Sequence, residues 1–180
     1  TDAVMLSAES AAGEYPVEAV EAMARVCLEA EKEYLVSHDR RITTISQSTI
    51  EEAIARATMF TASGLQIRAI AALTQSGVTA LLMSRRSSKV PIFALSPNEE
   101  TRRRVTLFRG VYPVEFGEGL SDPEEILNLA EEELLKRGVV RNGDIMVMTI
   151  GEPVGKSGGT NTMKIIKVGE WKSRQGIDAT

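Results

Sequence analysis

The stretch "RAIAALTQSGVTALLMSRR", from Arg68 to Arg86, decides the fold of this chain. Residues 68–73 form a short apolar run of the kind found in buried strands, and residues 76–86 repeat apolar side chains at helical spacing. The polar loop "TQSG" at 74–77 joins the two. A strand that leads through a short loop into a helix is the repeating unit of parallel sheets, so we expect further such pairs around it.

The same alternation continues on both sides of this stretch. A helix is predicted over 49–64, because Ser48 with Glu51 and Thr49 with Glu52 both have the spacing of a capping box. Further strands are predicted at 91–96, 111–116, 144–150 and 162–168, and further helices at 98–110 and 121–138.

These elements predict an α/β fold with three layers, α/β/α, around a mostly parallel five-stranded sheet. The fifth strand follows the fourth after a loop too short for a crossover, so it should pair antiparallel at an edge. Right-handed crossovers and double winding predict the strand order 3-2-1-4-5. The topological switch point, where the strand order reverses, then lies between the first and fourth strands, and the loops after these strands should meet there.

The part of the chain before residue 49 has a different pattern. Residues 1–6, "TDAVML", are predicted to be the end of a buried strand, and a helix is predicted from Pro16 to Tyr34. Residues 37–48 are polar and aperiodic, which is typical of a linker, and residues 170–180 form a tail without a periodic signal.

Composition limits the classes of protein to consider. The chain has 180 residues, of which 43% are hydrophobic and 26% charged, as in a globular domain with a small additional piece. The net charge of -4 favours neither nucleic acid nor an anionic membrane as partner. One cysteine and one histidine allow no internal disulfide and too few ligands for a zinc site, so we expect a cytoplasmic protein without its own metal.

A glycine-rich loop follows the fourth strand, "GEPVGKSGGTNT" from Gly151 to Thr162. It resembles a nucleotide-binding Walker loop, which has four residues between its first glycine and the Gly-Lys pair and opens a helix. Here three residues stand between Gly151 and Gly155, and a strand follows. The spacing therefore argues against an ATP-binding loop, and a tight hairpin turn at Gly158 and Gly159 is the simpler interpretation.

Both loops at the reversal point are rich in groups that bind phosphate. Hydroxyl groups and the free amides of a helix that begins at Ser76 and Gly77 would favour an anion in the first loop, and Lys156 would add a positive charge in the second. Ordinary capping by Thr74 or Ser76 stays the alternative for the first loop. The candidate phosphate-binding residues are Thr74, Gln75, Ser76, Gly77, Thr79, Lys156, Ser157, Gly158, Gly159 and Thr160.

Three segments resemble the pyruvate kinase family. "TDAVMLSAESAAGEYPVEAVEAM" is similar to the end of its catalytic TIM barrel. "TQSGVTALLMSRRSSKVPIFALSPNEETRRRVTLFRGVYPV" and "NGDIMVMTIGEPVGKSGGTNTMKIIKV" are similar to its C-terminal domain. The resemblance implies a stub of the barrel at 1–36 and, at 49–169, a domain that binds an effector and takes part in oligomerisation.

The resemblance also implies an activity for the complete enzyme. This family transfers a phosphoryl group from phosphoenolpyruvate to ADP, giving pyruvate and ATP, with Mg²⁺ and K⁺ as cofactors. Most of the catalytic barrel has no counterpart in this sequence. Ser7 and Glu9 match positions that line the family's active site, and they follow a predicted barrel strand on the face where such enzymes act. We expect this chain to be inactive by itself, with no cofactor of its own.

The C-terminal domain of the family is regulatory. It binds a phosphorylated effector between the two loops described above and contributes a subunit contact to a homotetramer. Members activated by fructose 1,6-bisphosphate carry a lysine in the first loop, where this chain has Gln75. Members of the animal type have a tryptophan and an arginine before the fourth strand, and "GEGLSDPEEILN" has neither. The resemblance therefore implies AMP or a sugar monophosphate as effector, or a purely structural domain with a degenerate pocket.

Overall fold

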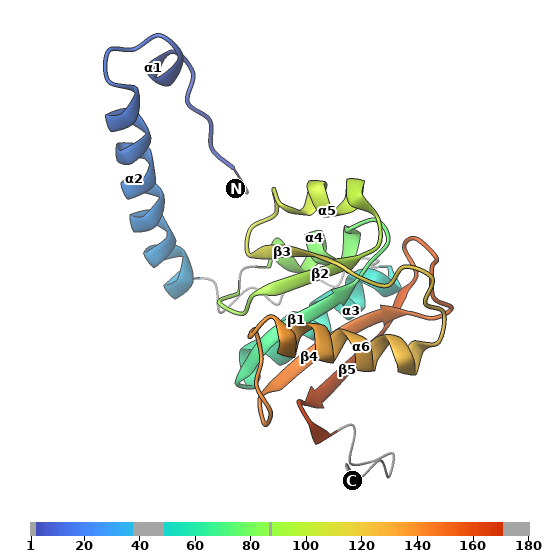
Figure 1. Cartoon of the computed structure of the whole chain (residues 1–180). Helices are drawn as coiled ribbons and strands as arrows, with labels where there is room; N and C mark the ends of the chain where they lie inside the picture. The colour runs from blue at the N-terminus through green and yellow to red at the C-terminus, as the bar shows by residue number, and fades with distance from the viewer. Residues whose placement is uncertain (1–2, 38–48, 87, 171–180) are drawn as a thin grey trace. The chain divides into compact units, whose positions relative to one another are not determined.

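The computed structural model describes residues 3–37, 49–86 and 88–170, which form two compact units divided between Ile45 and Ser46 (Figure 1). Most of the predicted linker, residues 38–48, lies outside the described residues, and so do residues 171–180 of the predicted tail.

The first unit consists of two helices, α1 (Ala8–Ala11) and α2 (Pro16–Ser37). The predicted helix from Pro16 is confirmed. The predicted strand at 1–6 is wrong for its described part, because residues 3–6 have no regular structure, and Met5 is 83% exposed. A strand needs a neighbour with which to form backbone hydrogen bonds, and the described residues of this unit provide none.

The second unit contains a five-stranded sheet with the order β3-β2-β1-β4-β5 (Figure 1). Every neighbouring pair is parallel except β4 and β5. The predicted order and the antiparallel last strand are therefore confirmed. The elements are α3 (Ile50–Gly64), β1 (Ile67–Leu73), α4 (Val78–Ser84), β2 (Ile92–Ser96), α5 (Glu99–Val105), β3 (Val111–Glu115), α6 (Pro123–Lys136), β4 (Ile145–Gly151) and β5 (Thr160–Lys167).

Local chemistry sets the ends of these helices. Thr49 begins α3 through a capping box: its hydroxyl accepts from the Glu52 amide at 3.2 Å, and the Glu52 carboxylate accepts from the Thr49 amide at 3.1 Å. The helix after β1 is shorter than predicted, because Gly77 has a left-handed backbone and α4 starts only at Val78. The helix after β2 is also shorter and ends at Val105.

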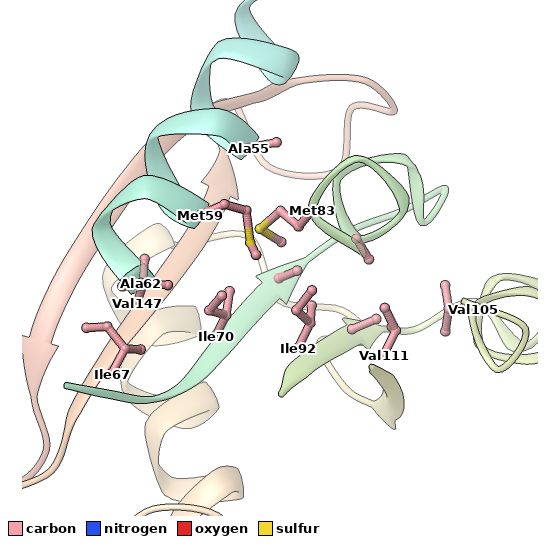
Figure 2. Packing of buried hydrophobic residues seen from close by; sticks show 13 residues of the cluster. Ala55, Met59, Ala62, Ile67, Ile70, Met83, Ile92, Val105, Val111 and Val147 are labelled. Carbon is pink, nitrogen blue, oxygen red and sulfur yellow. The ribbon is translucent and has the colours of Figure 1, made fainter. Parts of the chain in front are cut away.

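Two hydrophobic clusters cover the two faces of the sheet. On one face α3, α4 and α5 pack over the sheet, and Figure 2 shows Met59 of α3 and Met83 of α4 pointing toward each other near Ile70 of β1. On the other face Leu134 of α6 packs in a cluster with Met146 of β4. The three-layer arrangement follows from this alternation of side chains along each strand.

Gly77 allows α5 to pack closely against the loop after β1. Its φ of +80° is a conformation that residues with a side chain rarely adopt. A Cβ atom at this position would lie 2.8 Å from the Cγ1 atom of Val105 in α5. Gly110 has a similar φ of +69°, but a Cβ atom there would meet nothing within 4 Å.

The change Gly77→Ala should therefore destabilise the fold more than the matched change Gly110→Ala. Gly110→Ala should lower the free energy of unfolding by about 1–2 kcal/mol, the cost of a left-handed backbone. Gly77→Ala should cost about 1–3 kcal/mol more, because the new methyl group also overpacks against Val105. Urea denaturation of both variants measures the difference. Equal destabilisation would show that the close approach of α5 to Gly77 does not affect the free energy of unfolding.

Candidate functional site

The loops that follow β1 and β4 face each other across a cleft. β1 and β4 are parallel neighbours, so their carboxyl ends lie at the same edge of the sheet. The open volume of the cleft, including the solvent at its mouth, is about 540 Å³. The loops contribute the lining residues Thr74, Gln75, Gly151, Val154, Gly155, Lys156, Gly158 and Gly159.

Side chains from α5 and its N-terminal side hold the loop after β1. The Thr101 hydroxyl donates to the Gln75 carbonyl at 2.7 Å, and the Asn98 side-chain amide donates to the same carbonyl at 3.0 Å. Inside the loop, the Gly77 amide donates to the Thr74 hydroxyl at 2.9 Å. These contacts fix the backbone on one wall of the cleft.

Asn161 and a close backbone approach hold the glycine-rich loop. The Asn161 side chain accepts from the Glu152 amide at 3.0 Å and donates to the Glu152 carbonyl at 2.6 Å. A Cβ atom at Gly151 would lie 2.7 Å from the backbone carbonyl of Gly159, so only glycine allows the two ends of the loop to come this close. The second wall is therefore built largely from backbone.

Three polar side chains from three elements form a hydrogen-bonded chain beside the cleft. The Thr79 hydroxyl of α4 donates to the Glu51 carboxylate of α3 at 2.7 Å, and it lies 2.7 Å from the hydroxyl of Thr160, the first residue of β5. A hydroxyl has one hydrogen, and Thr79 gives it to Glu51, so Thr160 must donate to Thr79. Thr79 is fully buried, whereas Glu51 and Thr160 line the cleft.

The structure brings six of the ten predicted phosphate-binding residues to the cleft lining, namely Thr74, Gln75, Lys156, Gly158, Gly159 and Thr160. The others, Ser76, Gly77, Thr79 and Ser157, are not among the lining residues. The predicted helix start at Ser76 and Gly77 is wrong, because α4 begins at Val78, and neither Thr74 nor Ser76 caps it.

Glu51 and Asn161 are the two polar residues of this site that the sequence analysis missed as site residues. Glu51 was one of two carboxylates proposed for the capping box, but Glu52 alone fills that role in the structure. The sequence did contain a signal for Glu51: it is a second carboxylate in the first turn of the helix, which the capping box does not need. No local pattern marks Asn161, because its role depends on the return of β5 beside β4.

Ser7 and Glu9 lie in the first unit, next to each other at the start of α1. The Glu9 carboxylate accepts a hydrogen bond from the Ser7 amide at 3.0 Å. Hydrogen bonds from the backbone amides of Glu9 itself and of Ser7 hold the pKa of the Glu9 carboxyl below its ordinary value. Both residues are exposed.

Within residues 3–37, 49–86 and 88–170, His, Cys, Asp and Glu side chains form no group of three or more that could hold a metal ion. In the described part of the chain, no helix has both the length and the apolar character that crossing a membrane requires.

The chain is similar to several bacterial pyruvate kinases. The pyruvate kinase of Buchnera aphidicola subsp. Baizongia pistaciae is 43% identical over 172 residues, which are 93% of this chain and 35% of that protein. Pyruvate kinase II of Salmonella typhimurium is 44% identical with the same coverage. The pyruvate kinase of Haemophilus influenzae is 46% identical over 84% of this chain and 32% of that protein. The chain thus spans about a third of the length of these relatives.

A family model supports the same assignment for the sheet-containing unit. The model described as "Pyruvate kinase, alpha/beta domain" matches residues 52–166, more than half of the chain. The match includes both loops of the cleft and every strand of the sheet except the last residue of β5. The chain therefore belongs to the pyruvate kinase family, and residues 52–166 correspond to the family's alpha/beta domain.

Proposed function

We propose that this chain is the regulatory C-terminal part of a pyruvate kinase and that its cleft binds a phosphorylated effector. The observation that carries the proposal is the convergence of the two loops on one cleft, with hydroxyl, amide and lysine donors in its lining. A glycine-rich backbone lets peptide N–H groups approach a phosphate closely, and Lys156 adds the opposite charge.

The charge of the cleft supports a monophosphate rather than a bisphosphate. Among the lining residues, Lys156 is the one cation and Glu51 the one anion, so their formal charges cancel. Gln75, which lines the cleft, adds an amide but no charge. A ligand with two phosphate groups would find too little positive charge here, whereas AMP or a sugar monophosphate brings a single phosphate.

For the whole enzyme we propose the family's cytoplasmic, glycolytic reaction, phosphoryl transfer from phosphoenolpyruvate to ADP. Residues 1–36 would be the end of the catalytic barrel, with Ser7 and Glu9 beside the active site. Residues 37–48 would link it to the effector-binding domain at 49–169, and residues 170–180 would be a tail. Mg²⁺ and K⁺ would act in the barrel, and the full enzyme would be a homotetramer.

A purely structural role in oligomerisation is the second candidate. It is favoured by large apolar side chains that the second unit exposes, including Phe60 on α3 at 64% and Leu107 after α5 at 65%. A contact between subunits would cover exposed apolar side chains of this kind. In this case the cleft would be a remnant without a ligand.

Calorimetric titration of the chain with AMP, ribose 5-phosphate, glucose 6-phosphate and fructose 1,6-bisphosphate separates the two candidates. We expect saturable binding of at least one monophosphate. Lys156→Gln should weaken this binding by about tenfold, the loss of one charge-assisted hydrogen bond. Lys89→Gln, a matched change at an exposed residue outside the cleft lining, should not alter it. Absence of binding by all four compounds would support the structural role.

The isolated chain should not catalyse phosphoryl transfer. Such transfer depends on metal ions and cationic side chains positioned around the phosphoryl group, and the described residues contain no metal-binding cluster. A coupled pyruvate assay with phosphoenolpyruvate, ADP, Mg²⁺ and K⁺ should give the rate of a blank without protein. Turnover above the blank, in proportion to the amount of protein, would contradict this expectation.

A further inference from the structure

We propose that Glu51 determines which anions the cleft accepts, because its carboxylate holds the place of a phosphoryl group when no ligand is bound. The inference rests on the proposed effector-binding function and adds to it a residue with a defined role. Glu51 lies in the first turn of α3, outside both loops, and is the one acidic side chain among the lining residues.

The hydroxyl chain runs in one direction, toward the Glu51 carboxylate. Thr160 donates to Thr79, and Thr79 donates to the Glu51 carboxylate. The two hydroxyl dipoles therefore follow one another, and the Thr79 hydroxyl at the end of the chain points at a carboxylate, which is an anion. A phosphate oxygen is an acceptor of the same kind and would receive the same hydrogen from Thr79. The carboxylate and a phosphoryl group thus compete for one donor.

The Glu51 carboxylate also lies close to the glycine-rich loop. A Cβ atom at Gly158 would lie 3.8 Å from the Oε2 atom of Glu51, so the loop backbone passes close to the carboxylate. Lys156 belongs to the same loop and lines the same cleft. A phosphoryl group seated against this loop would therefore lie within a few ångströms of Glu51.

Glu51 has no part in the local cap of its helix. Thr49 and Glu52 satisfy each other in the capping box, so the neighbouring carboxylate is not needed to start α3. Its described hydrogen bond goes instead to Thr79, 28 residues further along the chain. The side chain can leave this hydroxyl to a ligand without loss of the cap.

These contacts allow Glu51 to discriminate between ligands by their negative charge. Each negative charge on a ligand is repelled by the carboxylate, and the repulsion grows with the number of charges at short range. Inorganic phosphate and a monophosphate must displace one carboxylate from one hydroxyl. A bisphosphate faces the same competition with an additional anionic group, while the lining has only Lys156 as a cation. Glu51 therefore narrows the cleft's preference to ligands with a single phosphoryl group.

The experiment compares Glu51→Gln with Glu52→Gln by calorimetric titration of the whole chain. Both variants lose one negative charge in the same helical turn. Glutamine at position 52 preserves the capping box, and glutamine at position 51 can still accept the Thr79 hydrogen bond. The probes are inorganic phosphate, ribose 5-phosphate and fructose 1,6-bisphosphate, and urea denaturation checks that each variant is folded.

We expect Glu51→Gln to bind inorganic phosphate and ribose 5-phosphate about tenfold tighter than the parent chain does. Its affinity for fructose 1,6-bisphosphate should increase by a larger factor, because that ligand carries more negative charge. Glu52→Gln should stay within about twofold of the parent, because its side chain points to the cap. An equal increase in affinity in both variants would show that only the net charge of the chain matters, and it would overturn the inference. If Glu51→Gln does not fold, Glu51→Ala replaces it with the same expectation.

The outcomes separate this inference from the proposed function. If the parent chain binds ribose 5-phosphate and Glu51→Gln binds it no better, Glu51 is not a selective residue, and effector binding stands. If only Glu51→Gln binds, the carboxylate closes the cleft of the parent chain, and the inference holds. If neither binds any of the three probes, the proposed function fails and the inference fails with it.

Discussion

The parallel pairing of β1 with β4 is the constraint on which the site depends. β1 also pairs with β2 on its other side, so the strands after β1 are added first on one side of it and then on the other. The loops after β1 and β4 consequently lie at one edge, although about 75 residues separate them in the sequence. Every contact of the cleft, from the hold of α5 on Gln75 to the approach of Gly151 and Gly159, builds on this arrangement.

The hydroxyl chain joins the elements around the cleft. Thr160 begins β5, Thr79 lies in α4, and Glu51 lies in the first turn of α3, so two hydrogen bonds connect three separate elements. Buried hydroxyls require partners, and here the partner at the end of the chain is a charged group that also lines the cleft. A ligand that replaces this partner would break the contact between α3 and α4, which is the kind of difference between states that allosteric regulation needs.

The sequence allowed the sheet to be predicted because its signals are local. Apolar runs, helical spacing and the short loop before β5 are enough for the strand order and for the antiparallel edge. The start of α4 was misplaced because the left-handed backbone of Gly77 depends on packing against Val105. Glu51 was missed for a similar reason, since its partner Thr79 is brought near only by the packing of α3 on α4. Residues 3–6, the described part of the strand expected at 1–6, have no neighbouring strand among the described residues of the first unit.

A crystal structure of the chain with ribose 5-phosphate bound would test most directly whether the cleft binds phosphate in competition with the Glu51 carboxylate. We predict a phosphoryl group between the two loops that accepts the hydrogen bond of the Thr79 hydroxyl, with the Glu51 carboxylate turned away from that hydroxyl. A ligand bound elsewhere, or an empty cleft at saturating ligand with the bond from Thr79 to Glu51 intact, would contradict this prediction.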